Sequence, residues 1–376
     1  MHVGLNLVYL VPGETGGMET YARELIPALL AERPELQLTA FVNRDAMAAR
    51  NGPWHDLVRT VTVPVSIRRR IEWVRGEQQL LPRLAESAGV ELVHSLASTA
   101  PAWGRFRRVV TIHDVIYRIY PEAHLGIRSL GMRLLVPLAA RRSDRIIVPS
   151  RSTGEDVVRL LGVPAEKVDV VSQGVGASVG SSEAAAGEAR MRYELGERQV
   201  LLAVSAKRPH KNLIRLLDAL ALIPAERRPV LVLPGYRTPY EDKLRRHAAL
   251  NALEGDVRLV GWVSAADLEG LYRAATCFVF PSLYEGFGLP ILEAMARGVP
   301  VACSNRGSLG EVAEGAARLF DPEDTASIAA AIDEVLGDPA LRERLRGLGL
   351  AQAAKFSWVA TARGTLASYE RALASR

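Results

Sequence analysis

Short apolar runs alternate with amphipathic helical patterns along the whole chain, and this alternation constrains the fold more than any other feature. The run HVGLNLVYLV is followed by the helical pattern METYARELIPALLAE and then by the apolar run LQLTAFVN. This order is typical of parallel strands covered by helices, because parallel neighbours need a long crossover connection. The sequence therefore predicts an α/β protein made of doubly wound, Rossmann-like sheets, with ligands at the carboxyl ends of the strands.

Two such units are expected, because 376 residues correspond to about two domains of ordinary size. We predict a first unit over residues 1–172 and a second over 190–356. Residues 173–189 are rich in Gly, Ser and Ala without an apolar period, so we interpret them as a linker. The last helical pattern begins near Ser357.

Composition excludes several classes of protein. The 48% of hydrophobic and 24% of charged residues are ordinary for a folded globular chain. No apolar stretch is long enough to span a membrane, and the N-terminal apolar run lacks the basic region of a signal peptide. The two cysteines, Cys277 and Cys303, lack the paired spacing of a metal or redox site and are predicted to be buried. We expect a cytoplasmic protein.

The net charge of +5 does not indicate nucleic-acid binding, because no zinc-finger, basic-zipper or RNA-binding signature accompanies it. Two basic amphipathic stretches fit either a peripheral contact with anionic lipid or an ordinary solvated surface. The first contains Arg68, Arg69, Arg70, Ile71, Trp73 and Val74, and the second contains Arg128, Arg133, Arg141 and Arg142.

Three familiar motifs are missing or misplaced. A dinucleotide fingerprint at GETGG would need glycine where Thr15 and Met18 stand, and there is no Walker A loop. The absence of an Asp-x-Asp pair weakens a metal-bridged nucleotide site, so neither a metal nor another cofactor is expected. A literal G-x-S-x-G places Ser178 in the linker, away from any strand-to-helix turn. A serine hydrolase is therefore a disfavoured alternative.

The strongest constellation is PSLYEGFGLPILEAMARGVP, residues 281–300. Pro290 suits the first turn of a helix, and Gly298 followed by Pro300 suits its end. The GFGL loop before this helix would direct backbone amides at an anion such as phosphate. We expect Glu285 in the loop and Glu293 in the first turn of the helix, and beside such a site both are suited to accepting hydrogen bonds from sugar hydroxyls. Taken singly, Glu293 also fits an ordinary helix-dipole partner and Glu285 a solvated loop acid.

This stretch resembles the Glu-x7-Glu motif of family 4 retaining glycosyltransferases, and the resemblance extends over essentially the whole chain. It implies the GT-B fold, in which two Rossmann-like domains face each other across a cleft. It also implies that Glu285 contacts the transferred sugar, that Glu293 binds the ribose hydroxyls, and that the loop amides touch the sugar and diphosphate. That loop consists of Gly286, Phe287, Gly288 and Leu289.

The segment SAKRPHKN resembles the phosphate clamp of the same family. Arg208 and Lys211 would follow a strand and begin a helix, where two cations can hold a diphosphate. His210 stands where many relatives carry a second basic residue, so Lys211 is the surer candidate. A surface role is the alternative for such a basic pair.

Three further segments resemble family elements. Gly16 and Gly17 match a glycine-rich loop that meets the donor diphosphate, although they also fit a simple strand-to-helix turn. His113 looks like the histidine beside the transferred sugar, with a structural hydrogen-bonding role as the alternative. Gly261 and Val263 match a segment that packs on the nucleobase. Two more matches have no assigned role beyond packing or recurrence, namely Trp262 and Glu311.

As a whole, the resemblance implies a metal-independent hexosyltransferase that acts with retention through front-face transfer in polysaccharide biosynthesis. The donor-side domain would be the second unit, and the helix over residues 357–376 would return to the first, acceptor-side unit. RPHKN and TIHDVIYRIYPE look like mannosyltransferase members, so GDP-mannose is the first donor expected and UDP-glucose the second. The acceptor would be a glycan or a lipid-linked glycan. A non-catalytic nucleotide-sugar-binding protein is the alternative.

Overall fold

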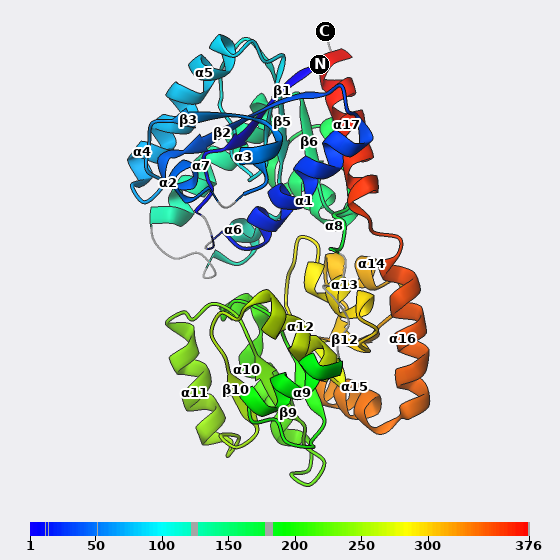
Figure 1. Ribbon diagram of the computed structural model, residues 1–376. Coiled ribbons are helices and arrows are strands. Elements are labelled where there is room, and N and C mark those ends of the chain that lie inside the picture. The colour runs from blue at the N-terminus through cyan, green and yellow to red at the C-terminus, as the bar shows by residue number, and fades with distance from the viewer. Residues whose placement is uncertain (12, 14, 51, 122–126, 177–182, 375–376) are drawn as a thin grey trace. The chain divides into compact units, whose positions relative to one another are not determined.

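The computed structural model describes residues 1–11, 13, 15–50, 52–121, 127–176 and 183–374 (Figure 1). Within these residues the chain forms two compact units. Unit 1 contains residues 1–174 together with 357–376, and unit 2 contains residues 175–356. Each unit has its own parallel sheet and its own hydrophobic cores. The sequence alternation described above thus corresponds to two separate α/β layers.

Unit 1 contains, in its described residues, a seven-stranded sheet in the order β3-β2-β1-β4-β5-β6-β7. Every strand pair is parallel. The chain moves outward in opposite directions from β1 and β4, and this reversal creates a topological switch point between them. The strands are β1 (His2–Leu7), β2 (Gln37–Asn43), β3 (Arg59–Val63), β4 (Leu92–Ser95), β5 (Arg107–Thr111), β6 (Arg145–Val148) and β7 (Val168–Val170).

Helices cover both faces of this sheet, and α17 from the C-terminus runs along α1 (Figure 1). The helices of unit 1 are α1 (Gly17–Glu32), α2 (Arg44–Ala49), α3 (Trp54–Leu57), α4 (Arg70–Arg75), α5 (Leu81–Ser87), α6 (Ile116–Ile119), α7 (Ile127–Arg142), α8 (Arg151–Leu161) and α17 (Trp358–Ala374). A π-helical turn, Gly76–Leu80, separates α4 from α5.

Helix α17 is part of the core of unit 1. The fully buried ring of Tyr369 lies near His94 of β4, and the Tyr369 hydroxyl is 2.7 Å from His94 Nδ1. His94 Nε2 is 2.8 Å from the hydroxyl of Thr111. Burial lowers the pKa of His94 to about 3, so its imidazole is neutral at pH 7. These contacts fix the final helix to the first sheet despite the large separation in sequence.

Unit 2 contains, among the residues described, a six-stranded sheet in the order β10-β9-β8-β11-β12-β13. All pairs are again parallel, and the switch point lies between β8 and β11. The strands are β8 (Val200–Leu202), β9 (Val230–Leu233), β10 (Val257–Leu259), β11 (Cys277–Phe280), β12 (Val301–Ser304) and β13 (Arg318–Phe320). The helices are α9 (Glu183–Arg192), α10 (Leu213–Leu222), α11 (Tyr240–Leu250), α12 (Ala265–Ala274), α13 (Leu289–Ala296), α14 (Ser308–Ala313), α15 (Thr325–Gly337) and α16 (Pro339–Ala353).

The expectation that residues 173–189 form a linker is wrong for their C-terminal part, because α9 begins at Glu183 and packs on α12. The small residues of this segment allow the close contact. A Cβ atom added at Gly270 of α12 would lie 2.6 Å from the carbonyl oxygen of Ala185. Alanine is also the best helix former. The lack of an apolar period here reflects close helix packing through small side chains.

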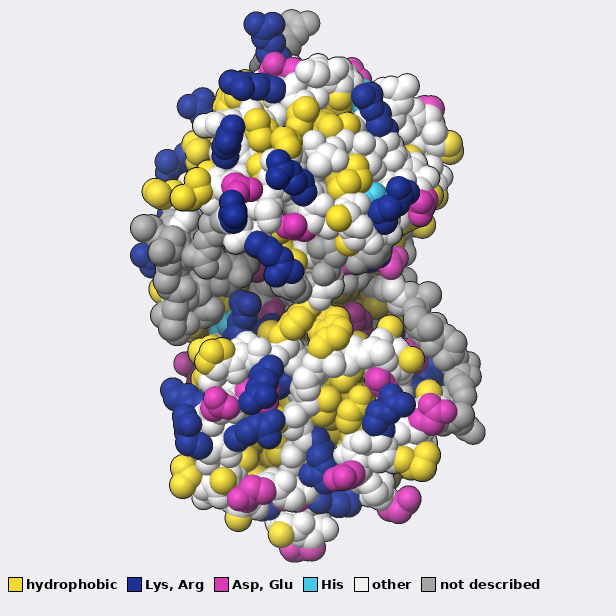
Figure 2. All heavy atoms as spheres, turned by 60° about the vertical axis from the view of Figure 1, so that its left-hand side comes forward, with side chains coloured by type: hydrophobic (Ala, Val, Ile, Leu, Met, Phe, Trp, Pro, Cys, Tyr) yellow, Lys and Arg dark blue, Asp and Glu magenta, His cyan; other side chains and the backbone are white. Residues whose placement is uncertain are grey.

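Both cysteines are fully buried, as predicted. Burial raises the pKa of Cys277 to about 12 and also raises the pKa of Cys303, so neither thiol is a reactive thiolate at pH 7. Among the residues that the structure describes, no helix is both long and apolar enough to cross a membrane. On the face that Figure 2 draws, the coloured basic side chains are interspersed with apolar, acidic and uncharged groups.

Candidate functional site

The switch point of unit 2 brings together the two segments that the sequence singles out. The loop after β8 carries Arg208 and Lys211, and the loop after β11 carries Glu285. Strands β8 and β11 are hydrogen-bonded neighbours, with Phe278 opposite Leu202. Because both loops leave the carboxyl edge of the sheet, they meet at the position where open α/β sheets bind ligands.

Lys211 and Glu285 form an ion pair at this edge. The Lys211 ammonium donates to Glu285 Oε1 at 2.5 Å, and each side chain is about 15% exposed. The ammonium also lies 5.3 Å from the ring centroid of Phe280, at the end of β11. Glu285 Oε2 accepts no hydrogen bond from the described residues. A lysine has three N–H donors, so this ammonium can hold Glu285 and still donate to an incoming anion.

Neighbouring groups hold this pair in place. Asn212, which has a positive φ of 58°, donates through its side-chain amide to the carbonyls of Pro281 and Pro322 at 3.1 and 2.7 Å. The buried hydroxyl of Ser308 donates to the backbone carbonyl of Glu285 at 2.9 Å. The turn containing Lys211 is thus tied to the segment that leads to Glu285. The sequence analysis missed Asn212, although its position next to Lys211 and its tolerance of positive φ were available signals.

The GFGL loop forms the entry to α13. Gly288 has φ of 108°, and a Cβ atom there would lie 2.7 Å from the side chain of Leu309, so both strain and space favour glycine. The Phe287 ring is buried and lies edge-on to Phe356, with ring centroids 5.8 Å apart. The main chain of Phe287 is therefore available to a ligand, whereas its side chain is not. Pro290 occupies the first turn of α13, as expected.

Glu293 lies one turn further along α13, in its second turn. The expectation of a first-turn position is wrong, because the helix begins at Leu289. Glu293 Oε2 accepts a hydrogen bond of 2.9 Å from the hydroxyl of Tyr272, and the side chain is partly buried. Burial raises the pKa of Glu293, whereas the Tyr272 hydrogen bond lowers it. Its Oε1 accepts no bond from the described residues and is suited to hydroxyl binding.

The loops after β9 and β10 join the same edge. Gly261 and Val263 follow β10, and the Gly261 carbonyl accepts a hydrogen bond of 3.1 Å from the backbone N–H of Gly235. A Cβ atom at Gly261 would meet nothing within 4 Å among the described residues, so the side of this residue on which a Cβ would lie is open. The sheet order β10-β9-β8 places these loops beside the one that carries Arg208.

Lys207 connects the loops that follow β8, β9 and β10, and the sequence analysis did not single it out. Its side chain is completely buried, and its ammonium donates to the carbonyls of Gly235 and Val260 at 2.8 and 2.6 Å. The buried carboxylate of Glu241 lies 3.9 Å away. Burial lowers the pKa of Lys207 to about 8. Fully buried lysines are rare because the ammonium loses its hydration, so this one serves a specific structural purpose.

In unit 1, Gly16 and Gly17 stand at the start of α1, as predicted. Gly16 precedes the helix with φ of 62°, a conformation that glycine adopts without strain. Among the described residues, a Cβ atom at either glycine would meet nothing within 4 Å. The described side chains therefore leave room beside the helix start, where the buried Glu19 side chain accepts from the backbone N–H of Gly13 at 2.9 Å.

His113 follows β5, and both of its ring nitrogens have partners in unit 1. Nε2 lies 2.8 Å from the carbonyl oxygen of Leu96, which can only accept, so Nε2 carries the proton. Nδ1 then accepts from the Gln173 side-chain amide at 3.0 Å. Burial lowers the pKa of His113, so the ring is neutral at pH 7. A neutral, doubly bonded imidazole is suited to fixed polar contact rather than to proton transfer.

A buried carboxylate near the switch point of unit 1 also escaped the sequence analysis. Glu77, in the π-helical turn, is 1% exposed and accepts hydrogen bonds from Asn6 at 3.0 Å and Thr99 at 2.8 Å. Burial raises its pKa, and the bonds from these neutral groups act in the opposite direction. Asn6 also donates to Ser95 at 3.1 Å. The carboxyl ends of β1 and β4 thus carry a network of buried polar groups.

The structure describes only some of the remaining residues that the sequence analysis named. Arg69 pairs with Glu72, and Ile71 is 86% exposed on the short helix α4. Leu134 on α7 is 68% exposed. Ser178, the candidate of the hydrolase alternative, lies outside the described residues, as do the side chains of Arg70 and Arg128. Glu311 lies in the first turn of α14, and its role stays unassigned.

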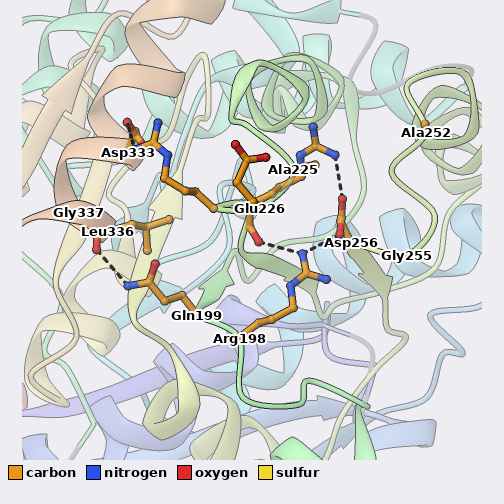
Figure 3. A pocket seen from close by; sticks show the side chains of 12 residues that line it. Arg198, Gln199, Ala225, Glu226, Ala252, Gly255, Asp256, Asp333, Leu336 and Gly337 are labelled. Atoms are coloured by element: carbon orange, nitrogen blue, oxygen red, sulfur yellow. Dashed lines mark hydrogen bonds and ion pairs between the residues drawn. The ribbon is translucent and has the colours of Figure 1, made fainter.

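A concave region at the opposite edge of the unit 2 sheet is a poor candidate site (Figure 3). Arg198 and Arg228, which precede β8 and β9, both pair with Asp256 before β10. The Gln199 amide donates to the carbonyl of Leu336. These polar groups satisfy one another, and they lie at the amino ends of the strands. Among the described side chains, none of the acidic, histidine and cysteine groups are clustered in threes to hold a metal ion.

Comparison with known families identifies the class of the protein. Residues 188–348 match the family described as Glycosyl transferases group 1, and residues 15–178 match Glycosyltransferase Family 4. The chain belongs to this family and is a glycosyltransferase with two Rossmann-like units of the GT-B type.

Individual relatives agree with this assignment. The chain is similar to O-antigen chain mannosyltransferase B of Escherichia coli, with 36% identity over 70% of each chain. The chain is also 31% identical to serotype-specific mannosyltransferase WbdA of the same species. This match covers 72% of the chain but only 34% of WbdA. Among solved structures, a sucrose-phosphate synthase from Thermosynechococcus elongatus has a TM-score of 0.80 at 23% identity, with 98% of both chains covered.

Proposed function

We propose that the chain transfers a hexose from a nucleotide sugar to a glycan or lipid-linked acceptor, with GDP-mannose as the first candidate donor and UDP-glucose as the second. The observation that carries the proposal is the Lys211–Glu285 ion pair at the switch point of unit 2, with Glu293 on the helix that follows. The names of the two E. coli mannosyltransferases support mannose as the transferred sugar.

The groups at this edge suit the parts of a nucleotide sugar. Breaking a sugar–phosphate bond leaves negative charge on the nucleoside diphosphate, so catalysis requires positive potential that is already in place. Lys211, Arg208 and the amides at the start of α13 supply it. Glu285 would accept a hydrogen bond from a sugar hydroxyl through Oε2, and Glu293 from a ribose hydroxyl through Oε1. Gly16 and Gly17 would add main-chain amides for the diphosphate.

We infer that the transfer retains the configuration at the anomeric carbon. Glu285 is held by Lys211 and is assigned to hydroxyl binding, so it is not the nucleophile. Attack on the same face from which the diphosphate leaves, with the leaving phosphate accepting the acceptor's proton, then gives an α-linked product from an α-linked donor. NMR of the product tests this step: an α-anomer supports it, and a β-anomer would overturn it.

Metal independence is part of the same proposal, because cations of the protein would neutralise the diphosphate. Activity should therefore persist after treatment with a chelator. Loss of activity on chelation that added Mg²⁺ restores would contradict this point.

A panel of nucleotide sugars tests donor identity. A ligand present at 100 times its Kd stabilises the fold by about 2.7 kcal/mol, which a thermal unfolding midpoint detects readily. GDP-mannose should give the largest shift. The alternative of a non-catalytic binding protein predicts the same shift without release of nucleoside diphosphate. A shift with UDP-glucose alone would move the assignment to the second candidate.

We also propose a peripheral contact of unit 1 with anionic lipid, supported by the exposed apolar side chains of Ile71 and Leu134 on two helices whose sequences contain several arginines. Co-sedimentation with vesicles containing phosphatidylserine should exceed that with neutral vesicles. It should fall in an Ile71→Ser, Leu134→Ser double variant, and equal binding by both proteins would overturn the proposal.

A further inference from the structure

The imidazole of His113 is held from several sides by residues of unit 1. Its Nε2 donates to the carbonyl of Leu96 at 2.8 Å, and its Nδ1 accepts from the side-chain amide of Gln173 at 3.0 Å. The buried ring of Tyr21, on α1, lies edge-on to the imidazole, with ring centroids 5.0 Å apart. The carbonyl partner belongs to the main chain, whereas Gln173 is a side chain that can be exchanged for one of the same shape and different hydrogen-bonding character.

Gln173 is itself fixed by the first turn of α17. It is 8% exposed and lies between β7 and Gly174, where the first stretch of unit 1 ends. The hydroxyl of the buried Thr361 donates to the carbonyl of Ser172 at 2.8 Å. A Cβ atom added at Gly174 would lie 2.3 Å from the backbone nitrogen of Trp358, so only glycine fits against this turn. Both chain neighbours of Gln173 therefore pack on α17.

Helix α17 also supports another side of the imidazole. The ring centroids of Trp358 and Tyr21 lie 5.9 Å apart. The Tyr21 hydroxyl is 3.5 Å from the hydroxyl of Thr111, which ends β5 two residues before His113. Thr111 in turn belongs to the hydrogen-bonded network that reaches α17 through the sheet. Two separate groups of contacts thus connect His113 to one helix.

The hydrogen-bonding partners of His113 match one state of its ring. A carbonyl oxygen only accepts and an N–H only donates, so the main-chain carbonyl and Gln173 together fit the neutral imidazole with its proton on Nε2. Burial lowers the pKa of His113, whereas the hydrogen bond to the carbonyl and the Asp114 carboxylate raise it. His94, whose pKa burial lowers to about 3, is neutral at pH 7, as is Tyr21, whose pKa burial raises to about 12. The side chain of Gln173 therefore selects the form that burial favours.

We propose that Gln173 is a positioning residue for the transfer reaction, that it sets the tautomer and orientation of His113, and that the first turn of α17 holds it in place. This inference rests on the proposed function, because it takes His113 as a residue of the reaction site. Gln173 acts through His113 rather than through contact with a substrate. A change confined to α17 should then alter kcat, while the donor KM, which depends on the Lys211–Glu285 edge of unit 2, stays the same.

Gln173→Glu tests the tautomer, because glutamate has the shape of glutamine but its carboxylate can only accept. Its ordinary pKa lies below that of imidazole, so the proton should reside on the ring and the pKa of His113 should rise by about 1 to 3 units. Side-chain 15N NMR of protein labelled at histidine measures both, with His113→Asn identifying the signals. The wild type should show a neutral ring protonated on Nε2 above pH 6.5, the ordinary pKa of histidine. Unchanged His113 signals in Gln173→Glu would overturn the proposal.

Steady-state kinetics with GDP-mannose tests the connection to the reaction. Gln173→Glu should lower kcat at least about tenfold, because the ring is charged and its Nδ1 has become a donor. It should also add an ionisation to the pH profile of kcat that the wild type lacks. Thr361→Val should lower kcat roughly fivefold, the equivalent of one hydrogen bond, with the donor KM unchanged. Thr361→Ser keeps the hydroxyl and should restore kcat.

Ser368→Ala is the matched control on the same helix, because the buried Ser368 hydroxyl donates to Asp169 of β7 at 2.7 Å instead of to the main chain beside Gln173. It should lower the unfolding midpoint about as much as Thr361→Val and leave kcat unchanged. Equal losses of kcat in the two variants would show that α17 acts through stability alone and would overturn the proposal. Absence of turnover by the wild type with every nucleotide sugar of the panel would overturn the proposed function, and the NMR result still decides whether Gln173 sets the tautomer.

Discussion

The carboxyl edges of the two sheets carry different chemistry on the same topology. In unit 2 the edge is charged, with the Lys211–Glu285 pair, the buried Lys207 and the partly buried Glu293. In unit 1 this edge carries the buried carboxyl of Glu77, whose pKa is raised by burial and whose hydrogen bonds come from the neutral side chains of Asn6 and Thr99, and His113, which is fully hydrogen-bonded in its uncharged form. A charged edge suits a diphosphate and a neutral polar edge suits hydroxyl groups, so the fold alone does not set the ligand.

The largest expected effect is on the charged edge. Lys211→Ala should lower kcat about 10²-fold, corresponding to about 3 kcal/mol, because it removes positive charge from the leaving diphosphate. Steady-state kinetics with saturating donor measures the effect. Lys243→Ala, at an exposed lysine of α11, should retain wild-type activity. A kcat for Lys211→Ala within about threefold of wild type would show that the ion pair is only structural.

Lys211 and Glu285 should also behave as one unit. Their double alanine variant should lose much less than the product of the two single losses, because residues in direct contact are not energetically independent. A double-mutant cycle on kcat/KM measures this coupling. Strictly additive losses would separate the two residues functionally.

The buried Lys207 gives unit 2 a distinctive pH dependence. The pKa of Lys207 is about 8 in the folded protein, against an ordinary value of 10.5. Between these two pH values the unfolded chain therefore binds more protons than the folded protein. The contribution of this group to the unfolding free energy therefore rises with pH across that window, by about 3 kcal/mol in total. Denaturant unfolding at several pH values should show that Lys207→Met lacks this rise, whereas the exposed-site control Lys243→Met keeps it. Parallel curves for wild type and Lys207→Met would contradict the burial argument.

A smaller effect is expected at the neutral edge of unit 1. His113→Asn should lower kcat about tenfold, the size of one lost hydrogen-bonding group of about 1.5 kcal/mol. The pH dependence of kcat above pH 6.5 should not change, because the lowered pKa keeps His113 neutral there. Disappearance of a basic-group ionisation from the profile would instead identify His113 as a proton-transfer group.

The smallest effect concerns Glu293. Tyr272→Phe removes the hydroxyl that donates to Glu293 Oε2, a hydrogen bond worth about 1 kcal/mol, so the donor KM should rise roughly fivefold. The same change removes a contact that lowers the pKa of Glu293. That pKa should rise further, and the acid limb of donor binding should move to higher pH. An unshifted limb would mean that Glu293 does not bind the donor in its ionised form.

The sequence predicted the sheet architecture and the motif residues because both have local signals. Alternating apolar runs and helical patterns indicate parallel sheets, and the Glu285 loop and the Lys211 turn each follow a strand. Their direct contact then follows from strand order, because β8 and β11 flank the switch point. The two unit boundaries observed lie at Gly174 and Ser357, close to the composition changes along the chain.

Other features depend on packing, which the sequence alone does not reveal. Lys207 and Arg208 are adjacent cations in one loop, and nothing local indicates that only the first is fully buried. Glu77 shows no motif, yet three-dimensional neighbours surround it completely. The first turns of α9 lack an apolar period because they pack through small residues. Each of these three features depends on a residue more than 20 positions away in the sequence. The partner is Gly235 for Lys207, Thr99 for Glu77 and Gly270 for α9.

Calorimetric titration of GDP into matched charge variants of the two edges of the unit 2 sheet tests the central claim most directly. Lys211 lies at the carboxyl edge, whereas Arg227 lies at the amino edge, in the concave region of Figure 3, where it pairs with Asp333. Lys211→Ala should weaken GDP binding at least about tenfold, as for a charge-assisted contact, and Arg227→Ala should leave it unchanged. The reverse outcome, with full affinity in Lys211→Ala and lost affinity in Arg227→Ala, would place the nucleotide at the wrong end of the strands and contradict the account.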